Sequence, residues 1–309
     1  MAFLSGIFGY ILNFLYELIN NYGIAIILFS ILLRLILIPI TIKQQKSMKK
    51  TAKMQEKMKE LQEKYKNNPE KLNQATIDLY KTENFSPFSG CFSGILQILI
   101  ILSVFWLVSQ PLTYMKKVDE QVINDYKTKI SEENEGQKST YPEIEIISKI
   151  ESEYQEINNE LANEEIENRE ELENKKENLE NMRINMEFLG LDLSKVPTQN
   201  LDNWKVYVIP VLYVITSFVS IKITTMAQKK ANSKKDIIIK DKENTDEMAE
   251  SMQQMSNSML YMTPIMSMSI AAIAPLGLAL YWLVSNILMI IERLVINKFI
   301  GSKEDEDDE

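Results

Sequence analysis

The stretch Gly23–Ile42, GIAIILFSILLRLILIPITI, decides the fold of this 309-residue chain. It is long enough to cross a bilayer as a helix, because about 20 residues rising 1.5 Å each match a hydrocarbon core about 30 Å thick. A central Arg costs about 3 kcal/mol on insertion scales, whereas each Leu, Ile or Phe returns roughly 0.3 to 0.6 kcal/mol. The sum favours insertion, so the stretch predicts a membrane-spanning helix whose Arg34 faces protein or water.

Two interpretations of Arg34 stay open at this point. Its side chain either reaches the near interface or pairs with a neighbour for structural reasons, or it lines a path for a substrate or an ion. The second interpretation is favoured, because ionisable residues at this depth are rare and usually functional.

The hydrophobicity of the chain is concentrated in blocks that are separated by charge. Apolar blocks occur at 3–19, 23–42, 91–112, 206–226 and 259–297. The last block is too long for one span, and a break at Ala274-Pro275 divides it into two short ones. The pattern predicts an all-α polytopic membrane protein with five transmembrane helices, at 23–42, 91–112, 205–226, 258–274 and 276–297.

The basic residues set the expected orientation. No Lys or Arg precedes the first span, whereas Lys43, Lys46, Lys49 and Lys50 follow it directly. Positive charge favours the cytoplasmic side, so the N-terminus is expected outside and the C-terminus inside. Residues 1–22 are expected to form an amphipathic helix in the interface, with a short extra span as the competing interpretation.

The segment 43–85 is expected to form a cytoplasmic helical hairpin broken at Asn67-Asn68-Pro69, since Pro suits the first turn of a helix. Its first arm carries a Met stripe that either packs inside the hairpin or contacts varied apolar partners. The residues expected to contact a client or the ribosome are Lys49, Lys50, Met54 and Met58. A polar cytoplasmic loop at 227–257 and an acidic tail at 298–309 complete the expected cytoplasmic side.

The segment 113–204 reads as a charged extracellular insertion. Residues at helical spacing keep an a/d rhythm in its middle part, namely Ile147, Ile150, Tyr154, Ile157 and Leu161. The rhythm lapses before a turn expected near Glu164–Glu170, which predicts a helical hairpin or short coiled coil. A solvated charged helix without a partner is the alternative.

Several kinds of chemistry lack their usual residues. The chain has no His and a single Cys, Cys91, so the commonest general base, the commonest metal ligand and any internal disulfide are missing. Neither GxxxxGK[ST] nor GxGxxG occurs. We therefore expect no cofactor, no metal and no enzymatic reaction.

A few polar side chains lie within the expected spans. The residues expected to line a groove are Arg34, Gln97, Ser103, Thr216, Ser217 and Ser220, with Ser285 and Asn286 nearer a span end. No Asp or Glu is expected at mid-membrane depth, so Arg34 is expected to be uncompensated and a proton-coupled carrier is disfavoured. A hydrated, positive groove could instead hold an anionic or polar group in transit.

An ordered set of motifs resembles the YidC/Oxa/Alb family of membrane protein insertases. The motifs are SILLRLILIPITIKQQKSM around Arg34, LQEKYKNNPEKLNQATIDLYK in the hairpin, SPFSGC followed by LQ, LGLDLS, and PLGLALYWLVSN from Pro275 to Asn286. The resemblance implies that Arg34 is the groove arginine of the family, in a cavity open to the cytoplasm and the bilayer.

The chain also departs from the family pattern. It has no lipoprotein cysteine near residue 1, and Ser220 stands where relatives often have Gln. Residues 116–187 look like an insertion, and the tail KEDEDDE is acidic where many relatives are basic. An acidic tail is repelled by RNA phosphates, so any ribosome contact is expected through the hairpin.

The resulting hypothesis is a multi-pass insertase of a bacterial plasma membrane. It would receive hydrophilic segments of nascent membrane proteins in the groove and release their apolar segments into the bilayer. The ribosome and a Sec translocon are further candidate partners. The alternatives are a small-solute channel or carrier that uses the same groove, and a structural or sensory protein built around the external segment.

Overall fold

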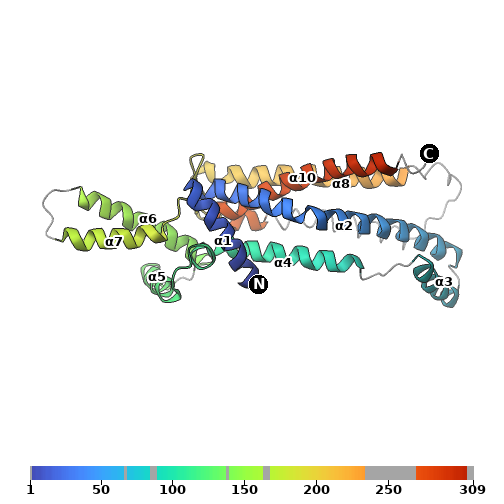
Figure 1. The fold of residues 1–309 in the computed structure, drawn as a ribbon, viewed down its shortest axis with the longest axis horizontal. Coiled ribbons are helices and arrows are strands. Elements are labelled where there is room, and N and C mark those ends of the chain that lie inside the picture. The colour runs from blue at the N-terminus through green and yellow to red at the C-terminus, as the bar shows by residue number, and fades with distance from the viewer. Residues whose placement is uncertain are drawn as a thin grey trace.

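The computed structural model describes residues 2–65, 68–83, 89–136, 139–162, 168–233 and 269–304, and these residues are mostly helical. Long helices run side by side along one axis and form a bundle (Figure 1). They are α2 (Tyr22–Lys64), α4 (Ser89–Ser109), α8 (Val208–Ser233) and α10 (Leu276–Glu304). We call the end of the bundle that holds α1 (Ala2–Ile19) the α1 end, and the opposite end the α3 end.

Four of the described helices are long and apolar enough to cross a membrane. The candidate spans are Ala2–Ile19, Tyr22–Gln44, Trp204–Ile223 and Leu276–Ile296, and the apolar helix Ile98–Ser109 is shorter. The chain is therefore an all-α membrane protein, as predicted. Five spans with the N-terminus outside stay a prediction. The helix Ala2–Ile19, expected in the interface, is among the four candidates, the predicted span 91–112 is not, and residues 234–268, with most of the loop 227–257 and of the span 258–274, lie outside the described part of the chain.

The helix α2 is longer than the span predicted within it. It begins after Asn21, whose side chain accepts from the Ile24 N–H, and continues for 43 residues. Its length of about 65 Å is twice the hydrocarbon thickness. Past residue 42 the sequence consists mainly of Lys, Gln, Met and Glu, which are strong helix formers, so the span and the first hairpin arm are one helix. The second arm is α3 (Pro69–Thr82), capped by the Asn68 side chain.

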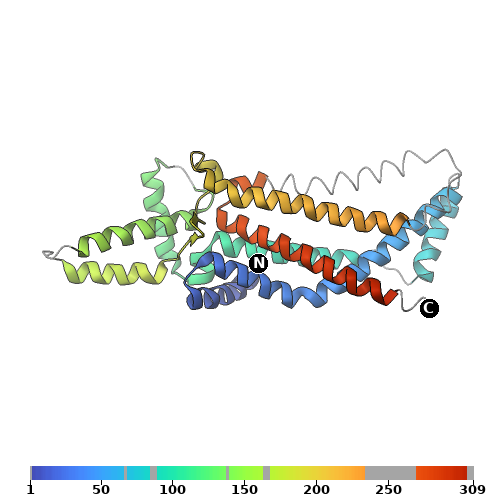
Figure 2. The ribbon, with the colours of Figure 1, turned by 90° about the horizontal axis from the view of Figure 1, so that it is seen from above.

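The helix α1 crosses the bundle obliquely at one end (Figures 1 and 2). It packs against α2, α4 and the π-helix η1 (Leu112–Lys116). Gly9 permits this approach, since a Cβ there would lie 1.8 Å from the Tyr114 carbonyl oxygen. The predicted span 91–112 ends earlier as a regular helix, at Ser109. Pro111 follows and lacks the backbone N–H that would continue the hydrogen-bond ladder.

The segment 113–204, which we call the external segment because its helices lie beyond one end of the bundle (Figure 1), contains more elements than a single helical hairpin. It comprises α5 (Glu120–Glu133), α6 (Pro142–Leu161), α7 (Arg169–Met182), the antiparallel strands β1 (Glu187–Phe188) and β2 (Leu191–Asp192), and the 3₁₀ turns η2 (Pro197–Gln199) and η3 (Trp204–Tyr207). The helices α6 and α7 lie side by side (Figure 1). Many apolar residues of α6 are buried, but on α7 only Leu179 is, so their shared apolar seam is short.

Residues 183–195, which we call the return segment, connect the external segment to the bundle. The Tyr22 N–H donates to the Asn185 carbonyl at 3.0 Å, and the Asn185 N–H donates to the Tyr16 hydroxyl at 2.8 Å. The Gly277 N–H donates to the Leu193 carbonyl at 2.9 Å. The return segment thus satisfies donors at the first turns of both α2 and α10, which would otherwise lack partners.

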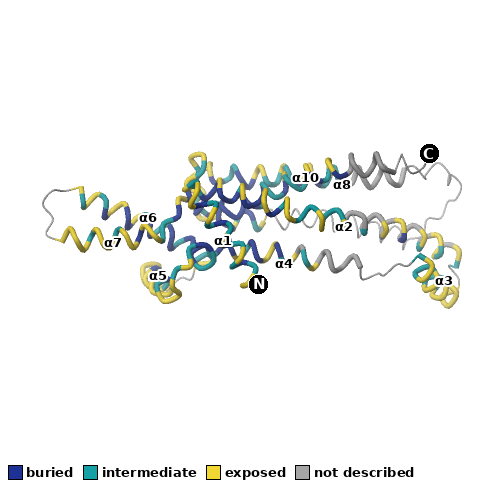
Figure 3. The backbone as a smooth tube through the Cα atoms, in the orientation of Figure 1, coloured by how far each residue is buried: buried dark blue, intermediate teal, exposed yellow. Residues whose placement is uncertain are grey.

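Buried residues gather at the α1 end of the bundle and around the return segment, and they become sparse along the far half of α2 (Figure 3). The fully buried side chains there include Leu12, Tyr22, Ile26, Leu193 and Leu276. Tight packing is therefore concentrated where α1, α2, α10 and the return segment meet.

An ion pair joins α6 to the end of α7. Arg183 holds Glu151 through two hydrogen bonds of 2.8 and 2.9 Å, and its guanidinium lies 3.7 Å from the centre of the Tyr154 ring. These bonds lower the pKa of Glu151 from its ordinary value of 4.5. Ionised Glu151 therefore stabilises the α6–α7 pair at neutral pH, and this contribution is lost as the pH falls through the lowered pKa.

We predict that Glu151→Gln loosens α7 at pH 7 by about 1 kcal/mol, the upper range for pairs this exposed to solvent. Below the pKa of Glu151 the variant and the wild type should be equal. Hydrogen exchange of the α7 amides at the two pH values measures the difference, with the exposed Glu156→Gln as a control that changes little. A difference that stays the same at both pH values would contradict the assignment.

Candidate functional site

Arg34 lies on α2 and turns its side chain toward α10. Its Nη2 donates to the Ser285 carbonyl oxygen at 3.2 Å, and its Nη1 lies 3.4 Å from Oε2 of Glu292. The Arg34 side chain is 19% exposed and that of Glu292 is 8% exposed. A largely desolvated ion pair therefore connects two helices that both qualify as membrane spans.

The expectation of an uncompensated Arg34 is wrong, because Glu292 is its partner. The helices α2 and α10 run in the same direction (Figure 1). Arg34 lies about 18 Å along α2 from Tyr22, and Glu292 lies about 24 Å along α10 from Leu276. The Arg34 side chain is long enough to span this difference in position along the two helices. In the sequence Glu292 precedes Arg293 near the end of an apolar block, a position typical of a charged helix end and not of a partner for Arg34.

A second polar contact joins α10 to α8. The Asn286 side-chain amide donates to the hydroxyls of Thr216 and Ser217, at 3.1 Å each. The Thr216 hydroxyl in turn donates to the Tyr213 carbonyl at 2.9 Å. Figure 2 shows α8 and α10 side by side along the bundle. Ser220 is buried one turn further along α8.

These contacts form one band, which we call the polar seam and define as Arg34, Glu292, Asn286, Thr216 and Ser217. Ser285, whose carbonyl accepts from Arg34, is next to Asn286 in the chain, so both contacts meet on one part of α10. The structure thus unites Arg34, Thr216 and Ser217 of the predicted groove, and it adds Asn286 and Glu292. Asn286 is recognisable in the sequence as an amide within an apolar block.

Ser103 does not belong to the polar seam. Its hydroxyl donates to the Leu99 carbonyl at 2.7 Å, and its own carbonyl accepts from the Ser5 hydroxyl of α1 at 2.9 Å. Ser103 is completely buried, so it serves the contact between α1 and α4 instead of a groove. Gln97 lies on α4, but its side chain is outside the described part of the chain.

The predicted contact residues of the hairpin differ in exposure. Lys50 is exposed, Met58 is half-buried, and the side chain of Lys49 is outside the described part of the chain. Met54 is only 4% exposed, so its thioether packs inside the hairpin and is not presented to a partner. Within the described residues, no three His, Cys, Asp or Glu side chains are grouped so that they could hold a metal ion.

The fold and the polar seam define a class, that of multi-pass helical membrane proteins with a charge pair between their spans. A family model described as 60Kd inner membrane protein matches residues 14–304. The chain therefore belongs to this family, the YidC/Oxa/Alb family that the sequence motifs indicated.

Two relatives carry the name membrane protein insertase YidC. The protein of Caldanaerobacter subterraneus subsp. tengcongensis is 36% identical over 108 residues, which cover 35% of this chain and 52% of the relative. The protein of Francisella tularensis subsp. novicida is 37% identical over 108 residues, covering 35% of this chain and 20% of the relative. The match thus spans about half the length of the first relative and a fifth of the second.

We predict that Glu292→Gln destabilises the protein, because it leaves the Arg34 guanidinium largely buried without a counter-ion. The expected loss is about 3 kcal/mol, and Arg34→Gln should cost a similar amount. The double variant should recover most of the stability, since a neutral pair carries no stranded charge. Thermal unfolding of the four proteins in one detergent measures the coupling between the two sites.

The matched control is Glu133→Gln, which removes the partner of Lys149 in the solvent-exposed external segment. It should cost less than about 1 kcal/mol. Effects of Glu292→Gln and Arg34→Gln that simply add, within about 0.5 kcal/mol, would show that the two side chains do not depend on one another.

Proposed function

We propose that this chain is a membrane protein insertase. It receives hydrophilic stretches of nascent membrane proteins at the polar seam, in a groove open to the cytoplasm, and releases their apolar stretches into the bilayer. The observation that carries the proposal is the largely desolvated Arg34–Glu292 pair between two apolar helices, which offers charged contacts at a depth where lipid offers none. The names of the two relatives support the same function.

The geometry of the Arg34 side chain suits contact with an additional polar group. A guanidinium carries five N–H donors in a planar fork, and here it contacts one backbone carbonyl and one carboxylate. The second carboxylate oxygen of Glu292, Oε1, is buried and accepts no hydrogen bond from the described residues. The pair is therefore only partly satisfied, and a polar group of a client can add hydrogen bonds to it without displacing Glu292.

The free energy for insertion comes from the client. Each apolar residue that leaves the aqueous phase for lipid returns roughly 0.3 to 0.6 kcal/mol. The membrane potential adds about 2.3 kcal/mol per translocated charge per 100 mV. The polar seam lowers the cost of the polar stretch that must move with it, through charge-assisted contact. No bond is made or broken, so the activity is that of an insertase and chaperone, not that of an enzyme.

The proposal places the α3 end in the cytoplasm, the α1 end outside, and α1 in the interface. The lysine-rich part of α2 then lies on the cytoplasmic side, where basic residues are favoured. The exposed Lys50 and the half-buried Met58 are the parts of the hairpin proposed to contact a client or the ribosome. A Sec translocon is a further partner in this proposal.

We predict that Arg34→Ala impairs insertion most for clients whose translocated segment is acidic. Loss of one charge-assisted hydrogen bond should lower the yield of such clients about tenfold, while clients with neutral segments change little. Arg34→Lys should give an intermediate result, because Lys keeps the charge but not the planar fork. The measurement is protease protection of translated clients in vesicles with each variant.

The control is Lys129→Gln, which removes a paired cation from the external segment and should leave insertion intact. Full insertion of acidic clients by Arg34→Ala, with folding verified by the melting temperature, would show that the proposed role is wrong. Flux of ions or small solutes through the purified protein without a client would instead favour the channel or carrier.

A further inference from the structure

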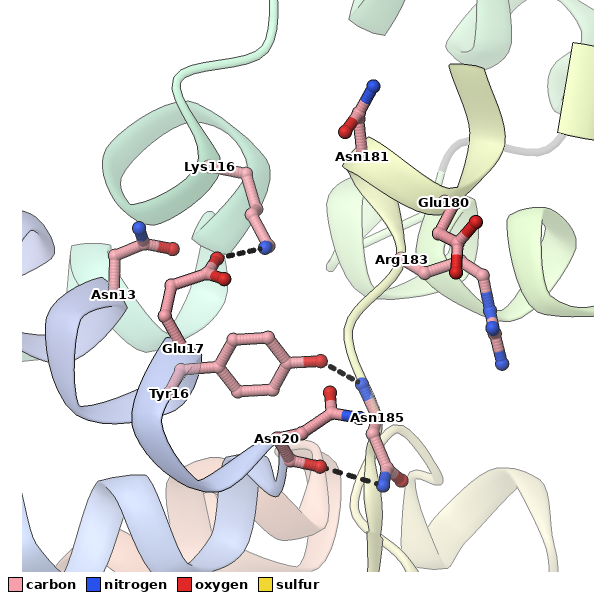
Figure 4. A pocket seen from close by; sticks show the side chains of 9 residues that line it. All are labelled: Asn13, Tyr16, Glu17, Asn20, Lys116, Glu180, Asn181, Arg183 and Asn185. Atoms are coloured by element: carbon pink, nitrogen blue, oxygen red, sulfur yellow. Dashed lines mark hydrogen bonds and ion pairs between the residues drawn. The ribbon is translucent and has the colours of Figure 1, made fainter. Parts of the chain in front are cut away.

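A polar cavity of about 610 Å³ lies at the α1 end, far from the polar seam along the bundle. Its walls come from α1, from Lys116 at the end of η1, and from the chain around the end of α7 (Figure 4). Every residue that lines it has a polar side chain, and two are cationic and two are acidic. A cavity of this size holds a phosphate that carries a short alcohol or amine, together with several waters. One water occupies about 30 Å³.

Of the two cations in this cavity, Arg183 is held by Glu151 through two hydrogen bonds, so Lys116 is the one offered to a ligand. Its side chain is only 11% exposed, and its ammonium group lies 2.8 Å from Oε1 of Glu17 and 4.9 Å from the centre of the Tyr16 ring. Glu17 itself is 58% exposed, so its carboxylate is well hydrated and can turn away. A largely buried ammonium with a solvated partner gains from a second anion that enters the cavity.

Asn13 supplies an unused acceptor. Its Oδ1 is buried and accepts no hydrogen bond from the described residues. Figure 4 shows Asn13 beside Glu17 and Lys116 on the same wall of the cavity. Because a buried acceptor without a donor is unfavourable, turning the Asn13 amide toward the cavity lets a ligand with both an anionic group and a hydrogen-bond donor satisfy Lys116 and Asn13 at once.

The position of α1 identifies where such a ligand comes from. One face of α1 is buried against the protein, and a second face exposes large apolar side chains, namely Phe3, Ile7, Tyr10, Phe14 and Leu18. The third face points into the cavity with Asn13 and Glu17, and Asn20 lines the cavity directly after α1 ends. Lys117 lies 4.7 Å from the centre of the exposed Tyr10 ring, a pairing typical of the boundary between lipid and water.

We propose that this cavity binds the headgroup of a phospholipid from the leaflet that contacts α1. Lys116 contacts the phosphate, and a terminal hydroxyl or ammonium group of the headgroup donates to Asn13. The acyl chains lie against the exposed apolar face of α1. The site is separate from the polar seam, so it does not depend on the proposed insertase activity.

The test uses the full chain in vesicles that contain equal amounts of phosphatidylethanolamine and phosphatidylcholine. Both headgroups carry a phosphate and no net charge, but only ethanolamine has N–H donors. Native mass spectrometry of the extracted protein counts the retained lipids. The wild type should retain phosphatidylethanolamine about tenfold over phosphatidylcholine, the preference expected from one hydrogen bond to a charged group.

Two variants separate the two contacts. Lys116→Gln should lower retention of both lipids about tenfold, whereas Asn13→Leu should remove only the preference. Lys149→Gln, another paired lysine of the external segment, should behave as the wild type. Melting temperatures verify folding. If Lys116→Gln fails to fold, the proposal is tested by whether Asn13→Leu loses the preference for phosphatidylethanolamine over phosphatidylcholine.

Equal retention of the two lipids by the wild type would overturn the proposal. So would binding of soluble glycerophosphoethanolamine as tight as that of the lipid, since the acyl chains would then contribute nothing. Crosslinks from position 116 to nascent chains, with none to lipid, would assign the cavity to a client instead.

Discussion

A guanidinium at the depth of the lipid chains must have polar partners, and this requirement organises the bundle. Arg34 of α2 obtains its partners from α10, as the Ser285 carbonyl and the Glu292 carboxylate. The same stretch of α10 then holds α8 through Asn286. Without a hydrophobic driving force between helices in lipid, such contacts and close packing determine which helices are neighbours.

The two ends of the bundle are built differently. At the α1 end the return segment bonds the first turns of α2 and α10, and the densest packing lies beside it. At the α3 end α2 continues well beyond its apolar part into the hairpin. The return segment fixes the first turns of α2 and α10 relative to one another, and the Arg34–Glu292 pair joins the same two helices further along.

The sequence predicted the features that depend on local composition. Three of the apolar blocks correspond to candidate membrane helices, and the motifs around Arg34 and Pro275 indicated the family. It did not predict the partner of Arg34, because the depth of Glu292 depends on how α2 and α10 are aligned. Nor did it predict that Ser103 faces α1, since helical periodicity cannot tell which neighbour covers a small polar residue.

Because α2 is continuous, it connects the hairpin arm directly to the part of the membrane span that carries Arg34. The lysines of the hairpin arm and Arg34 belong to one helix, α2. Pro39 is the only proline in α2, and it leaves the Leu35 carbonyl without its usual helical donor. A displacement of the hairpin end of α2 would therefore also displace the Arg34 guanidinium, unless the helix bends at Pro39. Any binding at the tip that displaces Arg34 would be linked reciprocally to binding at Arg34, each altering the affinity of the other by the same factor.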